Sequence, residues 1–288
     1  MRRRPLTLAV LAATALAVSA CAPQGEADDT AASSSGAENC SPADLETLEA
    51  ETLTIATDEP AYEPWVVGDA PESGEGFEAA VAYAVAEELG YTEDQVTWTR
   101  VPFNAAIQPG ARPFDFDINQ FSITDERKQA VDFSSPYYTV SQAVITTAGS
   151  AADGATSVED LKGLRIGAQV ATTSLQVLTD TIDPDSDPAV FNSNDDAKLA
   201  LQNGQVDAIV VDLPTAFFIT AAELDNGVIV GQLPDYGAGG DQFGLLLAKD
   251  SPLTDCVSQA VDALREDGTL AALEQEWLAD VADAPVLS

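Results

Sequence analysis

Histidine is absent from the 288-residue chain and basic residues are scarce, with 12 Lys and Arg against 48 Asp and Glu. The absence of histidine excludes Ser-His-Asp triads, histidine metal sites and histidine proton shuttles. The formal net charge of −36 argues against nucleic-acid binding, which depends on basic patches that face phosphates. A well-solvated acidic surface is the simplest interpretation of this charge, and recruitment of cations is the alternative.

The first apolar run, residues 6–18 (LTLAVLAATALAV), follows a basic start, Met1–Arg4. A membrane-spanning helix needs about 20 apolar residues, so this run is too short to span and instead predicts a signal peptide. It ends at Val18–Cys21 (VSAC), which resembles a bacterial lipobox. We therefore expect removal of residues 1–20 and a diacylglyceryl lipid on Cys21, which would anchor the protein on the extracytoplasmic face of the bacterial membrane. A plain secretory signal, which needs no cysteine, is the alternative.

The chain has only three cysteines, Cys21, Cys40 and Cys256. Once Cys21 is assigned to the lipid an even pair remains, and disulfides persist in exported proteins. We therefore expect a Cys40–Cys256 disulfide that pins the N-terminal segment to a C-terminal helix. Two free thiols are the alternative.

The first part of the chain is a polar stretch followed by alternating strands and helices. Residues 21–43 are small, polar and acidic without an apolar period, which predicts a flexible tether. From about Asp44 the pattern predicts strands at 53–57, 96–101, 114–121 and 141–147, and a helix at 77–90 that ends at Gly90.

The glycine-rich stretch 148–157 is followed by a second α/β series. The pattern predicts strands at 164–170, 189–193, 206–212, 227–231 and 243–249, and helices at 172–182, 195–204, 213–224, 252–268 and 269–280. We therefore expect one lobe made of residues 44–142 and 243–288, a second made of 148–235, and hinges at 143–147 and 236–242. A cleft between two such lobes is a preferred site for a small ligand.

Seven motifs follow one another in the order of a known family. They lie at 53–65 (LTIATDEPAYEPW), 76–90 (GFEAAVAYAVAEELG), 122–138 (SITDERKQAVDFSSPYY), 161–174 (LKGLRIGAQVATTS), 202–216 (QNGQVDAIVVDLPTA), 243–253 (FGLLLAKDSPL) and 264–277 (LREDGTLAALEQEW). This ordered set resembles the extracellular solute-binding proteins, family 3, of polar amino-acid ABC transporters, over residues 45–282.

The resemblance implies an α/β, two-lobed fold of the type II periplasmic-binding-protein class, with a mixed sheet flanked by helices in each lobe and a two-strand hinge. It implies a monomeric, lipid-anchored component of an ABC importer that captures a polar amino acid and delivers it to a membrane permease. It implies no catalytic residues, no cofactor, no metal and no nucleic-acid partner. Two other functions stay open: an enzyme on the same scaffold, such as a cyclohexadienyl or arogenate dehydratase, and a sensor module.

The resemblance also assigns residues to the ligand's carboxylate. Arg127 would bind it, because a guanidinium is a planar fork that matches two oxygens, and Ser122 would add a hydroxyl. An exposed arginine on a helix start is the alternative for Arg127, and its neighbour Lys128 is expected to be solvated. Thr172 and Thr173 begin a predicted helix, whose first N–H groups favour anions; ordinary capping is the alternative.

Other residues are assigned to the ammonium and the side chain of the ligand. Asp212 ends an apolar strand and would bind the ammonium, or else cap the next helix; Asp58 is a second candidate for the ammonium or the side chain. The aromatic residues Tyr62, Trp65 and Phe103 would sandwich the ligand, with core packing as the alternative. Gln120 and Gln169 would contact its side chain. The family often has a small residue at the position of Gln120, and the loop before Tyr62 is one residue longer here.

Overall fold

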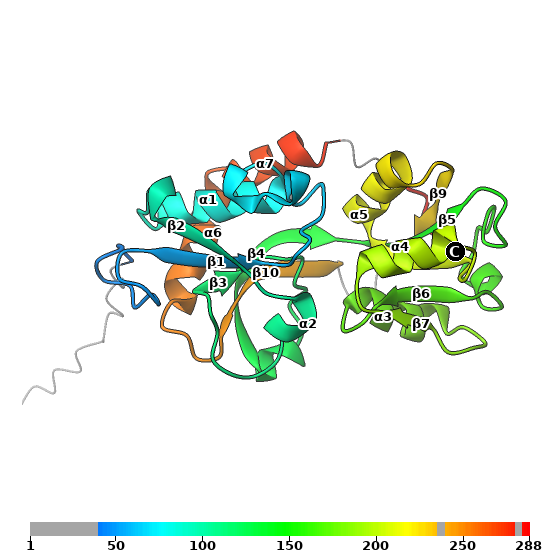
Figure 1. The fold of residues 1–288 in the computed structure, drawn as a ribbon, viewed down its shortest axis with the longest axis horizontal. Coiled ribbons are helices and arrows are strands. Elements are labelled where there is room, and N and C mark those ends of the chain that lie inside the picture. Colours follow the sequence, from blue (N-terminus) through cyan, green and yellow to red (C-terminus); the bar gives the residue numbers. More distant parts are fainter. Residues whose placement is uncertain (1–39, 235–239, 280–283) are drawn as a thin grey trace, which may run out of the picture. The chain divides into compact units, whose positions relative to one another are not determined.

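Two five-stranded mixed sheets flanked by helices make up the computed structural model, which describes residues 40–234, 240–279 and 284–288 (Figure 1). This architecture confirms the predicted two-lobed α/β fold. The predicted signal peptide, Cys21, tether residues 21–39 and hinge residues 236–239 lie outside the described residues. In the described part of the chain, no helix is both long enough and apolar enough to cross a membrane.

The first lobe contains a sheet with the strand order β2-β1-β3-β10-β4. β1 (Leu53–Thr57) is parallel to β2 (Val96–Arg100) and β3 (Phe116–Asp117), whereas β10 (Asp241–Ala248) is antiparallel to β3 and to β4 (Val131–Val140). Because the parallel strands share a direction, the residues that follow β1 and β3 lie at one edge of the sheet.

Helices cover both faces of the first sheet. α1 (Phe77–Glu88), α6 (Thr254–Glu266) and α7 (Thr269–Trp277) pack on one face, and the short α2 (Phe103–Ala106) lies on the other (Figure 1). β1 serves both cores, since alternate side chains point to opposite faces of a strand. Its residues Leu53 and Ile55 belong to the core under α1, and Ala56 to the core beside α2.

The second lobe repeats this plan with the strand order β7-β6-β8-β5-β9. β6 (Ile166–Gln169) is parallel to β7 (Ala189–Phe191) and β8 (Ala208–Asp212), and β5 (Gln142–Thr147) is antiparallel to β8 and β9 (Gly227–Gln232). β6 and β8 therefore also end at one edge.

The flanking helices of the second lobe are short. They are α3 (Thr173–Val177), α4 (Asn194–Gln202) and α5 (Leu213–Phe218), and π-helical turns at Leu178–Ile182 and Ile219–Glu223 continue α3 and α5. Their apolar side chains fill two cores: one includes Val177 of α3 and the other includes Ala197 of α4 and Ala216 of α5.

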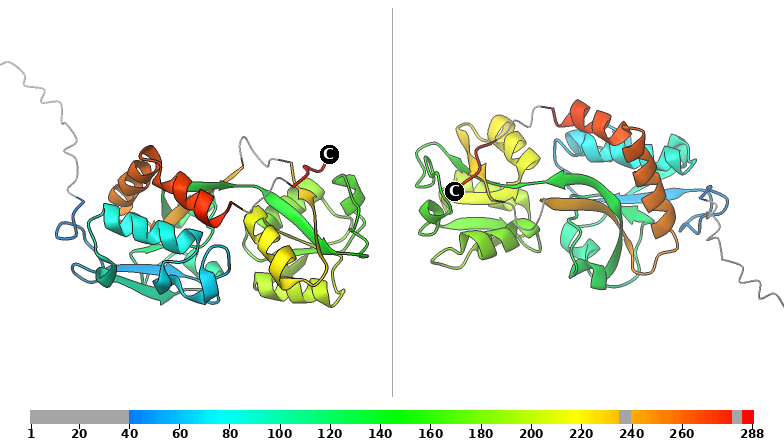
Figure 2. Two further views of the ribbon diagram at one scale, coloured as in Figure 1. Left: turned by 90° about the horizontal axis from the view of Figure 1, so that it is seen from above. Right: turned by 180° about the vertical axis from the view of Figure 1, so that it is seen from behind.

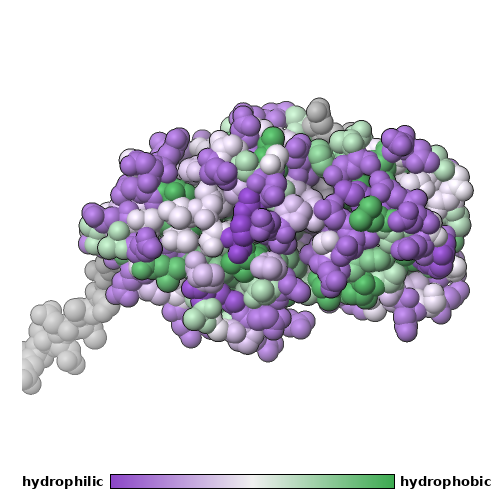
Figure 3. All heavy atoms as spheres, viewed as in Figure 1, coloured by the Kyte–Doolittle hydropathy of each residue, from purple (hydrophilic) through white to green (hydrophobic). Residues whose placement is uncertain are grey.

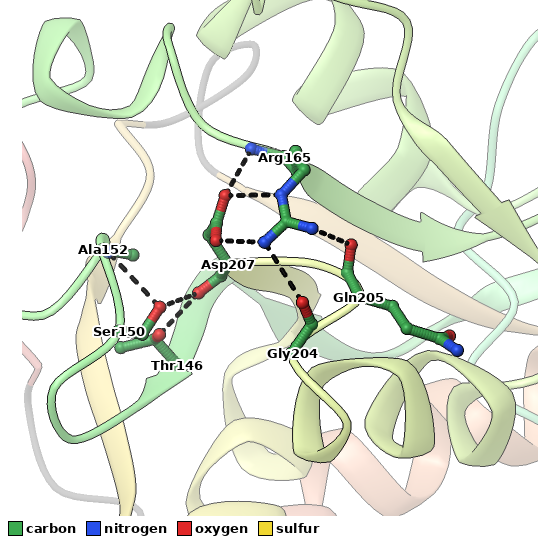
Figure 4. A network of polar contacts seen from close by, with 7 residues as sticks. All are labelled: Thr146, Ser150, Ala152, Arg165, Gly204, Gln205 and Asp207. Atoms are coloured by element: carbon green, nitrogen blue, oxygen red, sulfur yellow. Dashed lines mark hydrogen bonds and ion pairs between the residues drawn. The ribbon is translucent and has the colours of Figure 1, made fainter.

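A polar network fixes the end of the second sheet at which β6 and β8 begin (Figure 4). Arg165 Nη2 lies 2.7 Å from Asp207 Oδ1, and the same guanidinium donates to the carbonyls of Gly204 and Gln205. The carbonyl of Asp207 accepts from the hydroxyls of Thr146 and Ser150. The hydrogen bonds from Arg165 lower the pKa of Asp207. The ion pair therefore joins the starts of two strands, and the carbonyl of Asp207 ties them to the end of β5 and the turn after it.

The first crossing between the lobes differs from the predicted hinge. β4 ends at Val140 and β5 begins at Gln142, so the chain passes from one sheet to the other there (Figure 2). Residues 143–147, predicted as the hinge, lie within β5, where Ala143, Val144 and Ile145 are fully buried. The glycine-rich stretch 148–157 is a turn region inside the second lobe.

The C-terminal residues also differ from the prediction, which placed 243–288 in the first lobe. Gln232 of β9 donates its backbone N–H to the carbonyl of Pro285, and Leu287 packs in a core of the second lobe. The backbone N–H of Val158 reaches the carbonyl of Ser288 at 3.1 Å. Residues 284–288 therefore belong to the second lobe, so the chain crosses between the lobes a third time.

Two strands of the first lobe differ from the sequence pattern. β4 (Val131–Val140) was not predicted, because Ser134, Ser135 and Pro136 interrupt its apolar alternation. It lies at the edge of the sheet, where a strand tolerates proline. The strand predicted at 114–121 is reduced to Phe116–Asp117, and the residues after it turn into the space between the lobes.

The structure contains the predicted disulfide. Cys40 and Cys256 have their Cα atoms 5.5 Å apart and join segments separated by 216 residues. The bond holds the start of the described chain against α6, so residues 40–43, which were predicted as part of the tether, instead form a turn fixed to the first lobe.

The surface is dominated by polar residues on the face drawn in Figure 3. Large apolar side chains that are exposed in the described part of the chain are scattered over both lobes: Leu48, Val190, Leu199 and Val286. This surface fits the expectation that the acidic charge is solvated.

Removing the disulfide is expected to destabilise the first lobe. The double variant Cys40→Ser/Cys256→Ser should lose ~2–4 kcal/mol of unfolding free energy, because the long loop is no longer constrained in the unfolded chain. Urea unfolding followed by circular dichroism measures this loss. Reducing agent should shift the midpoint of the wild type and leave that of the variant unchanged. Equal midpoints for the variant and the oxidised wild type would contradict the expectation.

Candidate ligand site between the lobes

A polar pocket lies between the two lobes, at the carboxyl ends of β1, β6 and β8. It is lined from the first lobe by Asp58, Tyr62, Phe103, Asn119, Gln120 and Arg127, and from the second by Gln169, Thr172, Thr173, Ser174, Asn194 and Asp212. Of the eleven predicted ligand-binding residues, all but Trp65 and Ser122 line it. Its position at strand ends is the usual one for ligands of α/β folds.

Arg127 lies inside this pocket and is not the exposed arginine of the alternative interpretation. Its side chain is buried, with Nη1 donating to the carbonyl of Ser122 at 2.7 Å and Nη2 to that of Ala171 at 2.9 Å. The guanidinium carbon is 5.4 Å from the ring centre of Phe103. Burial lowers the pKa of Arg127 to about 10, and the carboxylates of Asp241 and Asp212 act in the opposite direction. The guanidinium therefore remains charged at neutral pH.

Among the described residues, no carboxylate lies within ion-pair distance of the Arg127 guanidinium. The described ranges hold nine basic residues, and seven of them pair with a carboxylate: Arg100, Lys128, Lys162, Arg165, Lys198, Lys249 and Arg265. Lys128 is half-exposed and pairs with Asp125, as expected of a solvated neighbour. A buried charge that meets carbonyl dipoles and an aromatic ring favours an anionic ligand.

Asp212 faces the same pocket from the second lobe. Its Oδ1 accepts from Gln142 Nε2 at 2.6 Å, the same nitrogen lies 3.2 Å from Asp241 Oδ2, and Gln142 Oε1 accepts from the hydroxyl of Ser174. Burial raises the pKa of Asp212 to about 7, and the bond from Gln142 opposes the rise. Among the described residues, the Asp212 side chain makes no capping hydrogen bond to α5. Helix capping, the alternative role for Asp212, is therefore not what its side chain does.

Asp58 supplies a second carboxylate to the pocket. Its Oδ1 accepts the N–H of Glu59 at 2.7 Å, and its Oδ2 accepts the N–H of Phe103 at 3.2 Å. Burial raises the pKa of Asp58, and the two backbone donors counteract the rise. The carboxylate therefore fixes the start of α2, and with it the ring of Phe103, while it faces the pocket.

Gln120 is held by the buried carboxylate of Glu78, which the sequence did not predict as part of the site. The backbone N–H of Gln120 donates to Glu78 Oε1 at 2.7 Å, its side-chain Nε2 donates to Glu78 Oε2, and the hydroxyl of Tyr137 donates to Glu78 Oε1. Gln120 has a φ of 47°, a left-handed conformation that these bonds stabilise. Burial raises the pKa of Glu78 to about 7 against the hydrogen bonds from Tyr137 and Gln120.

The threonines at α3 join the lobes as well as capping the helix. Thr172 Oγ1 accepts the N–H of Leu175 at 3.1 Å and donates to the carbonyl of Gln169 at 2.7 Å. Thr173 Oγ1 lies 3.0 Å from Ser122 Oγ in the first lobe. Ser122 is thus buried behind the pocket, where it supports Arg127 and Thr173 instead of lining the cavity.

The aromatic residues divide between the pocket and the core. Tyr62 and Phe103 line the pocket, and Phe103 stacks on Phe121 with ring centres 4.8 Å apart. Burial, followed by the nearby carboxylate of Asp195, raises the pKa of Tyr62. Trp65 departs from the sandwiching role, because its ring is fully buried among core residues of the first lobe. Its alternative, core packing, is what the structure has.

Five further residues of the site were not found from the sequence. Asn119, Ser174 and Asn194 line the pocket, and Glu78 and Gln142 hold residues that line it. Asn119 precedes the predicted Gln120 and Ser174 follows the predicted Thr173. Their place next to predicted residues was the one feature of the sequence that indicated a role in the site. Asn194 follows the capping residue Ser193 of α4, and nothing in its local pattern indicates a ligand.

The lobes are closed over the pocket. Its free volume is about 30 Å³, room for roughly one or two water molecules. A larger molecule therefore enters only when the lobes separate.

Two mixed α/β lobes that share a polar pocket at their strand ends define the class of two-lobed solute-binding proteins. Within this class the chain belongs to the bacterial extracellular solute-binding proteins, family 3, because a model of that family matches residues 53–280. The predicted family is thereby confirmed.

Relatives of this chain have names that state their ligands. An L-arginine-binding protein of Pseudomonas aeruginosa is 28% identical over 237 residues, which cover 78% of this chain and 90% of that protein. An L-cystine-binding protein of Escherichia coli is 29% identical over 214 residues, or 72% of this chain and 75% of that protein. The solved structure of an ancestral arginine-binding protein bound to arginine has a TM-score of 0.64 and 30% identity, and the match covers 79% of this chain and 98% of that one.

Proposed function

We propose that this protein captures a free amino acid between its lobes and delivers it to an ABC permease. The relatives named above are binding proteins for arginine and cystine, which supports binding over catalysis. A lipid on Cys21 would keep the protein, as a monomer, near the permease on the extracytoplasmic face of the membrane. Ligand binding would draw the lobes together through contacts made only in the closed state.

The observation that carries this proposal is the pair Arg127 and Asp212. An α-amino acid has a carboxylate and an ammonium close together, and burial of either charge without a partner is costly. Arg127 comes from the first lobe and pairs with no carboxylate among the described residues, and Asp212 comes from the second lobe. Arg127 would therefore bind the carboxylate and Asp212 the ammonium, so that the backbone of the ligand bridges the lobes.

The remaining lining residues receive supporting roles. Thr172 and Thr173 line the same pocket as Arg127 and would contact the ligand's carboxylate through their hydroxyls, with Ser122 behind them. The rings of Tyr62 and Phe103 would enclose the ligand. Gln120 and Gln169 would contact its side chain. Nε2 of Gln120 donates one hydrogen to Glu78, which leaves its second N–H and its amide oxygen for the ligand.

The charges of the pocket favour a cationic amino acid. Two carboxylates, Asp58 and Asp212, face one guanidinium, Arg127. A zwitterion leaves this set with one negative charge in excess, whereas a ligand with a second positive charge balances it. Asp58, together with the amide oxygen of Gln120, would accept hydrogen bonds from such a side chain.

A thermal-shift screen of the chain without residues 1–21 tests the ligand class. L-arginine, L-lysine and L-ornithine should raise the melting temperature most among amino acids, since a ligand at ~100 times its Kd adds about 2.7 kcal/mol to stability. Asp58→Asn should reduce the shift for cationic ligands more than the shift for neutral ones. A larger shift with acidic amino acids or dicarboxylates would contradict the charge argument, and no shift with any amino acid would contradict the proposed function.

Arg127→Ala tests the carboxylate assignment, with Lys128→Ala as its matched control. Charge-assisted hydrogen bonds contribute ~1.5–3 kcal/mol each, so Arg127→Ala should weaken binding of L-arginine at least about tenfold. Lys128→Ala removes the adjacent, half-exposed charge and should bind like the wild type. Isothermal titration calorimetry gives both values. The assignment fails if the two variants bind equally well.

Binding should weaken as the pH falls through 7. The ligand's ammonium pairs with ionised Asp212, whereas burial raises the pKa of Asp212 in the free protein to about 7, so below pH 7 the ligand must displace a proton. Affinity should be greatest above pH 7 and should fall by up to about tenfold per pH unit below it.

Titration calorimetry at pH 8, 7, 6 and 5 measures this dependence. Asp212→Asn, which cannot ionise, should bind weakly and lose the pH dependence over this range. A variant slope equal to that of the wild type would show that another group controls it.

A further inference from the structure

Trp65 is fully buried although it does not line the pocket. Its ring centre lies 6.1 Å from that of Phe77, 5.9 Å from Tyr138 and 5.7 Å from Phe243. Phe77 begins α1, and Tyr138 and Phe243 belong to β4 and β10, the strands at which the chain leaves and re-enters the first lobe. The ring is therefore fixed to the first lobe, close to the connections between the lobes.

The indole N–H of Trp65 nevertheless reaches the second lobe. Nε1 donates to the hydroxyl of Thr215 at 2.9 Å, and Thr215 lies on α5 with only 4% of its surface exposed. The preceding residues Pro64 and Pro214 line one apolar pocket together, where the same two segments meet. Trp65 and Thr215 thus join the lobes through a buried contact.

Other side-chain hydrogen bonds join the lobes in the described part of the chain: Gln142 donates to Asp241 at a lobe connection, and further bonds lie at the ligand site. Ser122 and Thr173 share a bond there, and Arg127 donates to the carbonyl of Ala171. A bound amino acid would compete for these groups. Neither Trp65 nor Thr215 lines the pocket, so their bond can persist with or without ligand.

The geometry makes this bond specific to the closed arrangement. An indole N–H only donates, and when buried it needs an acceptor. Because the aromatic cluster fixes the ring, separation of the lobes removes Thr215 from it, and the bond is lost. A contact that exists in one of two states shifts the population toward that state.

We infer that Trp65 and Thr215 form a closure contact, a positioning pair that stabilises the closed lobes without touching the ligand. The contact thereby sets ligand affinity through the fraction of protein that closes. The effect on affinity rests on the proposed function, whereas the effect on closure of the ligand-free protein does not.

Three substitutions isolate the bond, and a fourth is the control. Thr215→Val removes the acceptor and keeps the shape, Thr215→Ser keeps the hydroxyl, and Trp65→Phe removes the donor. The control is Trp98→Phe, because Trp98 Nε1 donates to the hydroxyl of Tyr83 at 3.3 Å within the first lobe. All are made in the chain without residues 1–21 and checked for folding by urea unfolding.

Small-angle X-ray scattering measures closure without ligand, and calorimetry with L-arginine measures affinity. Thr215→Val should enlarge the ligand-free radius of gyration, or weaken L-arginine binding ~2- to 10-fold, as expected for one lost hydrogen bond. Thr215→Ser should restore the wild-type values. Trp65→Phe should add nothing further in the Thr215→Val background, since one bond accounts for both effects.

The inference is overturned if Thr215→Val leaves both radius and affinity unchanged, or if Trp98→Phe alters them equally. If the wild type binds neither L-arginine nor any other amino acid while Thr215→Val still enlarges the radius, the closure contact stands and the proposed function fails.

Discussion

The buried guanidinium of Arg127 is the constraint on which the site depends. An ion that leaves water loses several kcal/mol of hydration, and the protein offsets this loss with one carbonyl from each lobe, Ser122 O and Ala171 O, and with the face of Phe103. These groups are dipoles and a quadrupole, so they solvate the charge without neutralising it. The same feature both holds the lobes together and leaves a positive centre for an anionic group.

The topology explains why carboxylates from both lobes meet at this point. In both sheets a parallel pair of strands ends at the pocket edge, with Asp58 after β1 and Asp212 at the end of β8. Each carboxylate is thus carried by a rigid strand from its own lobe. The hinge strands bring these two edges face to face, and Gln142, the first residue of β5, bonds both Asp212 and Asp241. The group that orients Asp212 is therefore part of a lobe connection.

The sequence predicted the elements of the fold better than the boundaries of its lobes. Buried strands such as β1 and β8 are short apolar runs bounded by turns, and their positions follow from that pattern. The hinge at 143–147 was misplaced because the glycine-rich surface turn that follows it has the composition of a linker. Whether such a turn joins lobes or elements within a lobe depends on strand pairing. The register of β5 between β8 and β9 is a long-range property that composition does not contain.

The site residues also divide into those that local sequence motifs predict and those whose roles depend on long-range packing. The charged residues that line the pocket, Arg127 and Asp212, were predictable because they lie in motifs whose residue types suit a charged ligand. Glu78 and Gln142 act through other residues, so their roles exist only once α1 and β5 are packed. Trp65 is the clearest case. An aromatic residue near a ligand-binding loop is suited both to lining a pocket and to packing in a core. Only the orientation of the loop decides which of the two positions the ring takes. Here the loop points the ring away from the pocket into an aromatic cluster, and the one polar atom of the ring, Nε1, finds its partner in the other lobe.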